Sequence, residues 1–230
     1  MPLYICATPI GNLEDITFRA LRILKEVDII AAEDTRHTKK LLDHYDIKTP
    51  ATSYHKFNIK AKTAYLIDLL KAGKNIALVS DSGTPAISDP GCELVQASIE
   101  QGIQVVTIPG PSAVIAALSI SGLPTDSFSF VGFLPKKPGK RRKALEGLQQ
   151  AGGTAIIYES PFRLTKTLEA VVEVLGESVP VAVARELTKK FEEVIRGSAR
   201  EVKEHFLVKA PKGEIVLLID LEHAAQSGEM

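Results

Sequence analysis

Short apolar runs alternate with stretches of helical periodicity through the first half of the chain. The clearest run, Ile76–Val79, is wholly apolar and ends in a loop of small, polar and turn-forming residues. An apolar run bounded in this way is typical of an interior strand of a parallel sheet. Similar runs at Leu3–Ala7, Asp28–Ala32 and Val105–Ile108 are separated by segments with helical spacing. The pattern therefore predicts an N-terminal parallel sheet covered by helices.

The pattern changes after Pro109–Ser112, the densest cluster of helix- and strand-breaking residues between periodic segments. We place a domain boundary there, with an N-terminal α/β domain at residues 1–112 and a C-terminal α/β domain at 113–230. Beyond it, strands are expected over residues 127–133, 154–159, 179–185, 192–196 and 214–220. Residues 134–143 are expected to form a loop, and residues 224–230 a frayed end. This mixture predicts a mixed C-terminal sheet, so the fold class is α/β with two domains.

Composition limits the kind of partner and the compartment. The chain has 28 Lys and Arg against 28 Asp and Glu, so its formal net charge is zero. No global field attracts a polyanion, although a local basic patch is still possible. Cys6 and Cys92 lie in apolar segments and are expected to be buried thiols of a reducing compartment. Neither a signal peptide nor an apolar run of ~20 residues is present, so we expect a cytoplasmic protein without a membrane span.

Polar or glycine-bearing loops follow several of the predicted strands, at residues 8–12, 33–37, 80–91, 109–113 and 159–163. In open α/β sheets, ligands bind beyond the carboxyl ends of the strands. The 80–91 loop is rich in small residues whose backbone can approach a ligand, and Asp81 adds an acceptor for a cationic group. A long connection without a ligand is the open alternative. P-loop, dinucleotide-binding, zinc and nucleophile-elbow motifs are absent from the sequence, which disfavours kinase-, zinc- and hydrolase-type functions.

Nine stretches, in the same order from Ala7 to Ile219, resemble the tetrapyrrole methylase superfamily and, within it, the small-subunit ribosomal RNA (cytidine-2′-O)-methyltransferases. They are ATPIGNLEDIT, AEDTRHTKKLL, ALVSDSGTPAISDPG, IPGPSA, SGLPTD, GFLP, YESPFR, ARELTK and KGEIVLLI. The resemblance implies a two-domain tetrapyrrole methylase-like fold that holds S-adenosylmethionine in the cleft between its domains, usually as a homodimer.

The resemblance also implies a set of donor-binding positions. These are Pro9, Ser80, Asp81, Gly83, Thr84, Ile87, Ser88, Ser112, Ala113, Tyr158, Leu187, Gly213 and Glu214. Three of these positions keep a plainer interpretation, because Ser112 and Ala113 could simply begin a helix and Tyr158 could be a core aromatic. No metal site is predicted.

A charged cluster follows a strand that should be buried, and it consists of Glu33, Asp34, Arg36 and His37. Methyl transfer to a ribose oxygen needs donor and acceptor in line and a group that takes the hydroxyl proton. Glu33 and Asp34 are the first candidates for that base, and Arg36 could fix a phosphate or a carboxylate. His55 and Asn58 are second candidates. The open alternative is a solvated charged loop.

Six cations fall within the eight residues 136–143. Such a local field suits phosphate contacts, and we predict RNA binding by Lys136, Lys137, Lys140, Arg141 and Arg142. Phe133 and Phe57 are candidate platforms for exposed bases. A solubilising surface is the alternative.

The chain departs from the family pattern at two places near the predicted site. After His55 the family usually has a further histidine, then an asparagine and a glutamate, and residues 56–59 of this chain keep only the asparagine. Phe162 stands where the family often has histidine. No catalytic role is therefore transferred to those positions. The leading hypothesis is 2′-O-methylation of a cytidine in 16S ribosomal RNA, as free RNA or in the small subunit. A tetrapyrrole carbon methyltransferase and a non-catalytic RNA-binding module are the alternatives.

Overall fold

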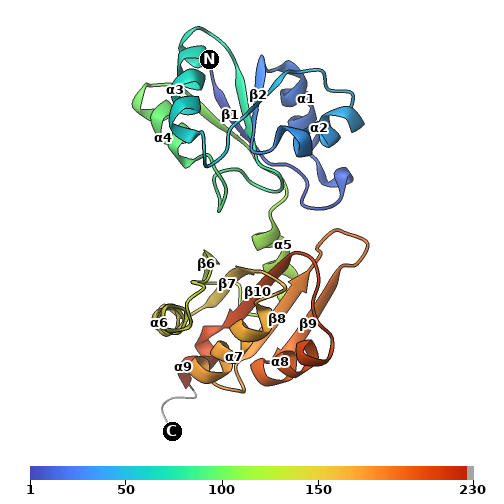
Figure 1. Cartoon of the computed structure of the whole chain (residues 1–230), viewed down its shortest axis with the longest axis vertical. Coiled ribbons are helices and arrows are strands. Elements are labelled where there is room, and N and C mark those ends of the chain that lie inside the picture. The colour runs from blue at the N-terminus through green and yellow to red at the C-terminus, as the bar shows by residue number, and fades with distance from the viewer. Residues whose placement is uncertain (227–230) are drawn as a thin grey trace. The chain divides into compact units, whose positions relative to one another are not determined.

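The computed structural model describes residues 1–226, with side chains described through residue 223. The chain divides into two compact units, one of residues 1–112 and one that starts at Ala113 (Figure 1). The division falls directly after the Pro109–Ser112 cluster of breaking residues.

The first unit contains a five-stranded parallel sheet with strand order β3-β2-β4-β1-β5. The strands are β1 (Leu3–Cys6), β2 (Ile29–Ala32), β3 (Ala51–Ser53), β4 (Ile76–Val79) and β5 (Val105–Ile108). All four residues of β4 are buried, as expected for an apolar strand covered on both faces. The predicted parallel sheet is confirmed, and the carboxyl ends of its strands meet at one edge.

Helices cover both faces of this sheet (Figure 1). They are α1 (Phe18–Glu26), α2 (Thr35–His44), α3 (Ile59–Lys71) and α4 (Cys92–Glu100), with a short 3-10 turn, η1 (Leu13–Asp15). Side chains of α1 and α2 pack with Cys6, Ala77 and Val79. Those of α3 and α4 pack with Ile76 and Leu78. Because side chains alternate along a strand, the two helix pairs lie on opposite faces.

The second unit contains a mixed five-stranded sheet with strand order β6-β7-β10-β8-β9. The strands are β6 (Phe128–Phe133), β7 (Thr154–Glu159), β8 (Pro180–Arg185), β9 (Glu193–Ser198) and β10 (Ile215–Asp220). Only β6 and β7 pair in parallel; β10 is antiparallel to β7 and β8, and β8 is antiparallel to β9. The predicted mixed sheet is confirmed.

Five helices complete the described part of the second unit. They are α5 (Ala113–Ser121), α6 (Pro138–Gln149), α7 (Leu164–Leu175), α8 (Ala199–Val208) and α9 (Leu221–Gln226). Apolar side chains of α6, α7 and α8 form one core with β7, β8 and β10, and α5 packs against β8 and β10. No helix within residues 1–226 is long and apolar enough to cross a membrane.

Three local predictions are wrong. Helix α6 begins at Pro138, so residues 138–143 are helical instead of part of a loop; proline is favoured in the first helical turn, where its missing N–H costs nothing. Cys92 is exposed, whereas Cys6 is buried as expected. Residues 224–226, predicted to belong to a frayed end, are the last three residues of helix α9, and residues 227–230 lie outside the described part of the chain.

Candidate functional site

Hydrogen bonds join the loops that follow β1, β4 and β5. The N–H of Thr8 donates to the carbonyl oxygen of Gly83 (2.9 Å), and the N–H of Gly83 donates to the carbonyl oxygen of Thr8 (3.0 Å). The Thr84 hydroxyl donates to the carbonyl oxygen of Pro111 (3.3 Å). The predicted donor-binding residues of the first unit are thus placed on neighbouring segments. They are Pro9, Ser80, Asp81, Gly83, Thr84, Ile87, Ser88 and Ser112.

The 80–91 loop has an unusual backbone. Gly83, Ala86 and Ser88 have φ values of 75°, 69° and 62°. Left-handed conformations cost residues with a side chain about 1–3 kcal/mol each and cluster at ligand sites. Ser80 is buried and its hydroxyl donates to the carbonyl oxygen of Ser82 (3.1 Å), whereas Ser88 at the loop tip is exposed. The fold therefore holds this loop in one strained shape with its tip in solvent.

Carboxylates cluster beside this loop, at the end of β2. The N–H of Asp34 donates to Asp81 Oδ1 (3.0 Å). Burial raises the pKa of Glu33, and the charges of Asp89 and Asp81 raise it further. Burial likewise raises the pKa of Asp89. Glu33 consequently holds a proton more strongly than an ordinary glutamate does.

Asp34, the neighbour of Glu33, has a structural role. It is the N-cap of α2, and its Oδ1 accepts from the backbone N–H of Arg36 (2.9 Å). The Arg36 guanidinium donates to both carboxylate oxygens (3.0 and 2.6 Å). These hydrogen bonds, led by the one from the Arg36 side chain, hold the pKa of Asp34 well below its usual range. Asp34 is therefore a weaker proton acceptor than Glu33, and Arg36 lies in the first turn of a helix instead of in a loop.

A cavity of about 480 Å³ opens over the ends of β2 and β3. Residues 33–36 and 55–57 line it together with Ser53 and Asp81, and we call it the β2–β3 pocket. The pocket brings the three predicted catalytic residues, Glu33, Asp34 and Arg36, to one place with the second candidate His55. Asn58, the other second candidate, fastens the loop that forms one wall of the pocket.

In the second unit, the segments of Leu187, Gly213 and Glu214 also come together. The N–H of Glu186 donates to the carbonyl oxygen of Glu214 (2.9 Å), and the N–H of Glu214 donates to Glu186 Oε1 (2.9 Å). Gly213 has a φ of 83°, and a Cβ there would lie 2.3 Å from the carboxyl carbon of Glu186. Tyr158 on β7 pairs with Val216 of β10, close in sequence to Glu214. Four of the predicted positions therefore lie near the end of the second sheet where β7 and β8 finish and β10 begins.

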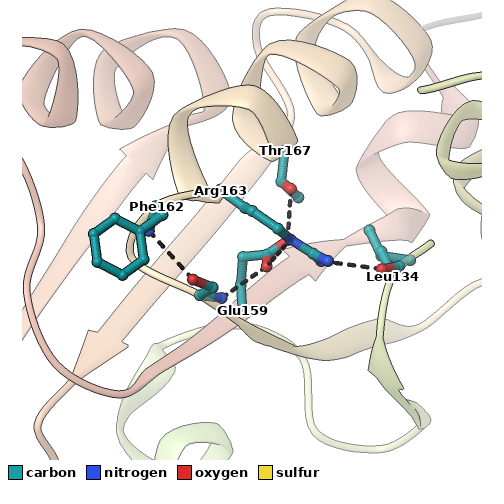
Figure 2. Close-up of polar contacts among 6 residues, drawn as sticks. Leu134, Glu159, Phe162, Arg163 and Thr167 are labelled. Atoms are coloured by element: carbon teal, nitrogen blue, oxygen red, sulfur yellow. Dashed lines mark hydrogen bonds and ion pairs between the residues drawn. The ribbon is translucent and has the colours of Figure 1, made fainter. Parts of the chain in front are cut away.

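A buried carboxylate next to Tyr158 anchors the end of β7 (Figure 2). The Glu159 side chain is fully buried and accepts from Arg163 (2.8 and 3.0 Å), the Thr167 hydroxyl (2.6 Å) and the N–H of Ser160 (2.7 Å). Arg163 also donates to the carbonyl oxygen of Leu134 (3.0 Å), just before α6. The motif YESPFR was noted in the sequence only because it resembles the family sequence. Its Glu-x-x-x-Arg spacing at a buried strand end was the available signal for this network.

The predicted RNA-binding cations divide into two groups. Lys136, Lys137 and Lys140 are exposed, and so is Arg142, which forms an ion pair with Glu173. Arg141 is only 7% exposed, so its prediction as a surface contact is corrected: its position in α6 turns it into the unit. Exposed Phe133 lies edge-on to Tyr158. Among residues 1–226, no group of three or more His, Cys, Asp and Glu side chains is placed to hold a metal ion.

Known proteins resemble this chain over most of its length. The family model of tetrapyrrole (corrin/porphyrin) methylases matches residues 2–203. Ribosomal RNA small subunit methyltransferase I of Halalkalibacterium halodurans is 53% identical, with 95% of this chain and 75% of that protein covered. The proteins of the same name from Bacillus subtilis and Thermotoga maritima are 50% and 47% identical, covering 95% and 94% of this chain and 74% and 97% of those proteins.

Solved structures share the fold at low sequence identity. A uroporphyrin-III-C-methyltransferase from Thermus thermophilus has a TM-score of 0.67 at 22% identity, covering 99% of this chain and 97% of that one. A cobalt precorrin-4 methyltransferase has a TM-score of 0.73 at 18% identity, covering 96% and 95%. A diphthine synthase has a TM-score of 0.73 at 14% identity, covering 99% and 95%. These likenesses confirm the predicted fold class.

Proposed function

We propose that this chain, which belongs to the tetrapyrrole (corrin/porphyrin) methylase family, methylates small-subunit ribosomal RNA and uses S-adenosylmethionine as the methyl donor. The observation that carries the proposal is the 47–53% identity, over about 95% of the chain, to proteins named ribosomal RNA small subunit methyltransferase I. The tetrapyrrole-methylating structures are at most 22% identical and share the fold alone. Fold does not choose the acceptor, so RNA is favoured over a tetrapyrrole.

The residues of the first unit fit the donor in chemistry. S-adenosylmethionine supplies an electrophilic methyl group on a positively charged sulfonium, next to an amino acid tail. Asp81 presents a carboxylate beside the small-residue loop, and one of its oxygens is fixed by the Asp34 N–H (3.0 Å). A negative charge at this point suits the ammonium group of the tail. The donor positions proposed in the second unit, Ala113, Tyr158, Leu187, Gly213 and Glu214, remain predictions.

For the reaction itself we assign the acceptor as the ribose 2′-hydroxyl of a cytidine. The 2′-oxygen bonds to the methyl carbon, the bond from that carbon to sulfur breaks with its electron pair on sulfur, and the hydroxyl proton passes to a base. Glu33 is the base that the electrostatics favour, because its raised pKa gives it the stronger pull on a proton. Arg36, exposed at the pocket rim, is suited to a phosphate of the acceptor strand.

Transfer of a labelled methyl group to small ribosomal subunits and to free 16S RNA tests the proposal. Digestion to nucleosides should place the label in 2′-O-methylcytidine. Label on a base, or transfer only to a tetrapyrrole, would contradict it. Calorimetric titration with S-adenosylmethionine should give saturable binding, and its absence would favour a non-catalytic RNA-binding module. The cytoplasmic location and the homodimer remain predictions.

A further inference from the structure

The β2–β3 pocket has an exposed aromatic ring at its edge. Phe57 is 85% exposed and lines the cavity, together with Lys56 and Arg36. The Lys56 ammonium lies over the Phe57 ring, 5.0 Å from its centre, and the centre of the His55 ring lies 6.0 Å from it, with the two ring planes at 65°. An aromatic face flanked by cations is the combination on which single-stranded nucleic acids stack their bases and rest their phosphates.

The loop that presents Phe57 is fastened to its surroundings. Asn58 Oδ1 accepts from the N–H of His55 (2.9 Å), and Asn58 Nδ2 donates to the carbonyl oxygen (3.3 Å) and the hydroxyl oxygen (3.2 Å) of Ser53. Tyr54 just before it is fully buried, and its N–H donates to the carbonyl oxygen of Ala32 (2.7 Å) on β2. These hydrogen bonds fix the backbone that presents the exposed ring. Little conformational entropy of the loop is therefore lost when a base stacks on the ring.

The charges inside the pocket differ from those at its rim. Glu33 and Asp81 line the cavity, whereas Lys56 and Arg36 carry their charges in solvent. Carboxylates accept hydrogen bonds from ribose hydroxyls and from the exocyclic amine of cytosine, and cations contact phosphates. A nucleotide that stacks on Phe57 would find acceptors on one side and cations on the other.

From this arrangement we infer that the β2–β3 pocket is the subsite for the acceptor nucleotide, with its base stacked on Phe57, its phosphates on Lys56 and Arg36 and its ribose toward Glu33. The inference rests on the proposed function, in that the nucleotide is taken to be the one that is methylated. Phe57 is then a positioning residue: it holds the base while the chemistry takes place on the sugar.

Alanine substitution at Phe57 tests the subsite in kinetics. Phe57→Ala should raise the KM for small ribosomal subunits about 5- to 150-fold, the effect that alanine has on base–aromatic stacking. Phe57→Tyr should restore most of the loss, and the Kd for S-adenosylmethionine should not change. Phe18→Ala is the matched control, because Phe18 is 93% exposed in the same unit and is not among the residues that line the pocket.

A binding measurement separates this inference from the proposed function. The chain has no tryptophan, so Phe57→Trp introduces a single indole as a reporter. Short oligocytidylate should quench its fluorescence and should leave that of Phe18→Trp unchanged. Equal KM values for the two alanine variants, or equal quenching of the two tryptophans, would overturn the inference while wild-type methylation upheld the proposed function. Quenching at position 57 with no wild-type transfer to RNA would uphold the base-stacking site and reject the function.

Discussion

Replacing Glu159 with alanine removes the charge at the centre of the network shown in Figure 2. Among the residues that the structure describes, the variant leaves Arg163, whose side chain is 20% exposed, with only the carbonyl oxygen of Leu134 as a partner. The buried Thr167 hydroxyl loses the carboxylate to which it donates. Breaking a buried ion pair typically costs 3–5 kcal/mol, and a buried hydroxyl without a partner costs about 1 kcal/mol more. Because Arg163 reaches some solvent, we expect Glu159→Ala to lower the free energy of unfolding by about 3–5 kcal/mol in total.

A matched control shows whether burial causes the effect. Arg142 and Glu173 form an ion pair whose side chains are 54% and 51% exposed, also within the second unit. Exposed pairs contribute at most about 1 kcal/mol, so Glu173→Ala should change stability by no more than that. Glu159→Gln keeps an acceptor oxygen without the charge and should fall between wild type and Glu159→Ala.

Urea unfolding followed by circular dichroism gives the free energies. Hydrogen exchange at amides of β7 and β10 then locates the loss, since a chain with two compact units need not unfold in one step. A double-mutant cycle of Glu159→Ala with Arg163→Ala should give a coupling energy above 1 kcal/mol. Destabilisation no larger than that of Glu173→Ala, or a coupling energy near zero, would refute the argument from burial.

Three further predictions concern charge, backbone and assembly. Hydrogen bonds, first from Lys209, lower the pKa of Glu193 from its ordinary 4.5 to about 2. This group therefore contributes stability above pH 4.5 that is lost as the pH falls toward 2, and urea titrations of Glu193→Gln should show a smaller loss over that range. Gly213→Ala should raise the Kd for S-adenosylmethionine in calorimetry, because its Cβ would collide with the carboxyl group of Glu186. Sedimentation equilibrium should give twice the monomer mass of 24.9 kDa, and a monomer would contradict the homodimer.

The strands could be predicted because their signal is local. All four residues of Ile76–Val79 are buried, so the strand is covered on both faces. An apolar run between turn-forming residues predicts such a strand. The predicted loop at residues 138–143 is wrong because Pro138 was misinterpreted. The proline- and lysine-rich composition of residues 134–143 predicts a loop, whereas Pro138 at the first position of α6 begins a helix. The prediction that Arg141 contacts RNA rests on the same error, since a residue in a loop can face solvent. On its side of α6, Arg141 is buried.

The network around Glu159 could not be derived from composition. Its partners Arg163 and Thr167 are local, four and eight residues further along the chain, but Leu134 precedes it by 25 residues, beyond any sequence periodicity. Only the parallel pairing of β6 with β7 brings the end of one strand beside the end of the other. The candidate site residues were therefore easier to predict than the buried network at the end of β7.

Glu33 and Asp34 are consecutive acids that the sequence could not rank, and the structure separates them by environment. Burial and neighbouring carboxylates raise the pKa of Glu33, whereas hydrogen bonds from the Arg36 side chain and from its backbone N–H lower that of Asp34. Titratable groups whose pKa values are pushed apart take different roles. Glu33→Gln should thus lower kcat by about 10²–10⁴-fold, the usual contribution of a general base.

The neighbouring substitution supplies the control. Asp34→Asn retains an oxygen that caps α2 and should leave kcat within about tenfold of wild type, because the charge that it removes is already neutralised by Arg36. In the wild type, log kcat should rise with pH over a range that lies above the ordinary pKa of glutamate. The profile of Glu33→Gln should lack this rise. If Asp34→Asn instead produced the larger loss, with Glu33→Gln nearly as active as wild type, the carboxylate bound to Arg36 would have to be the base.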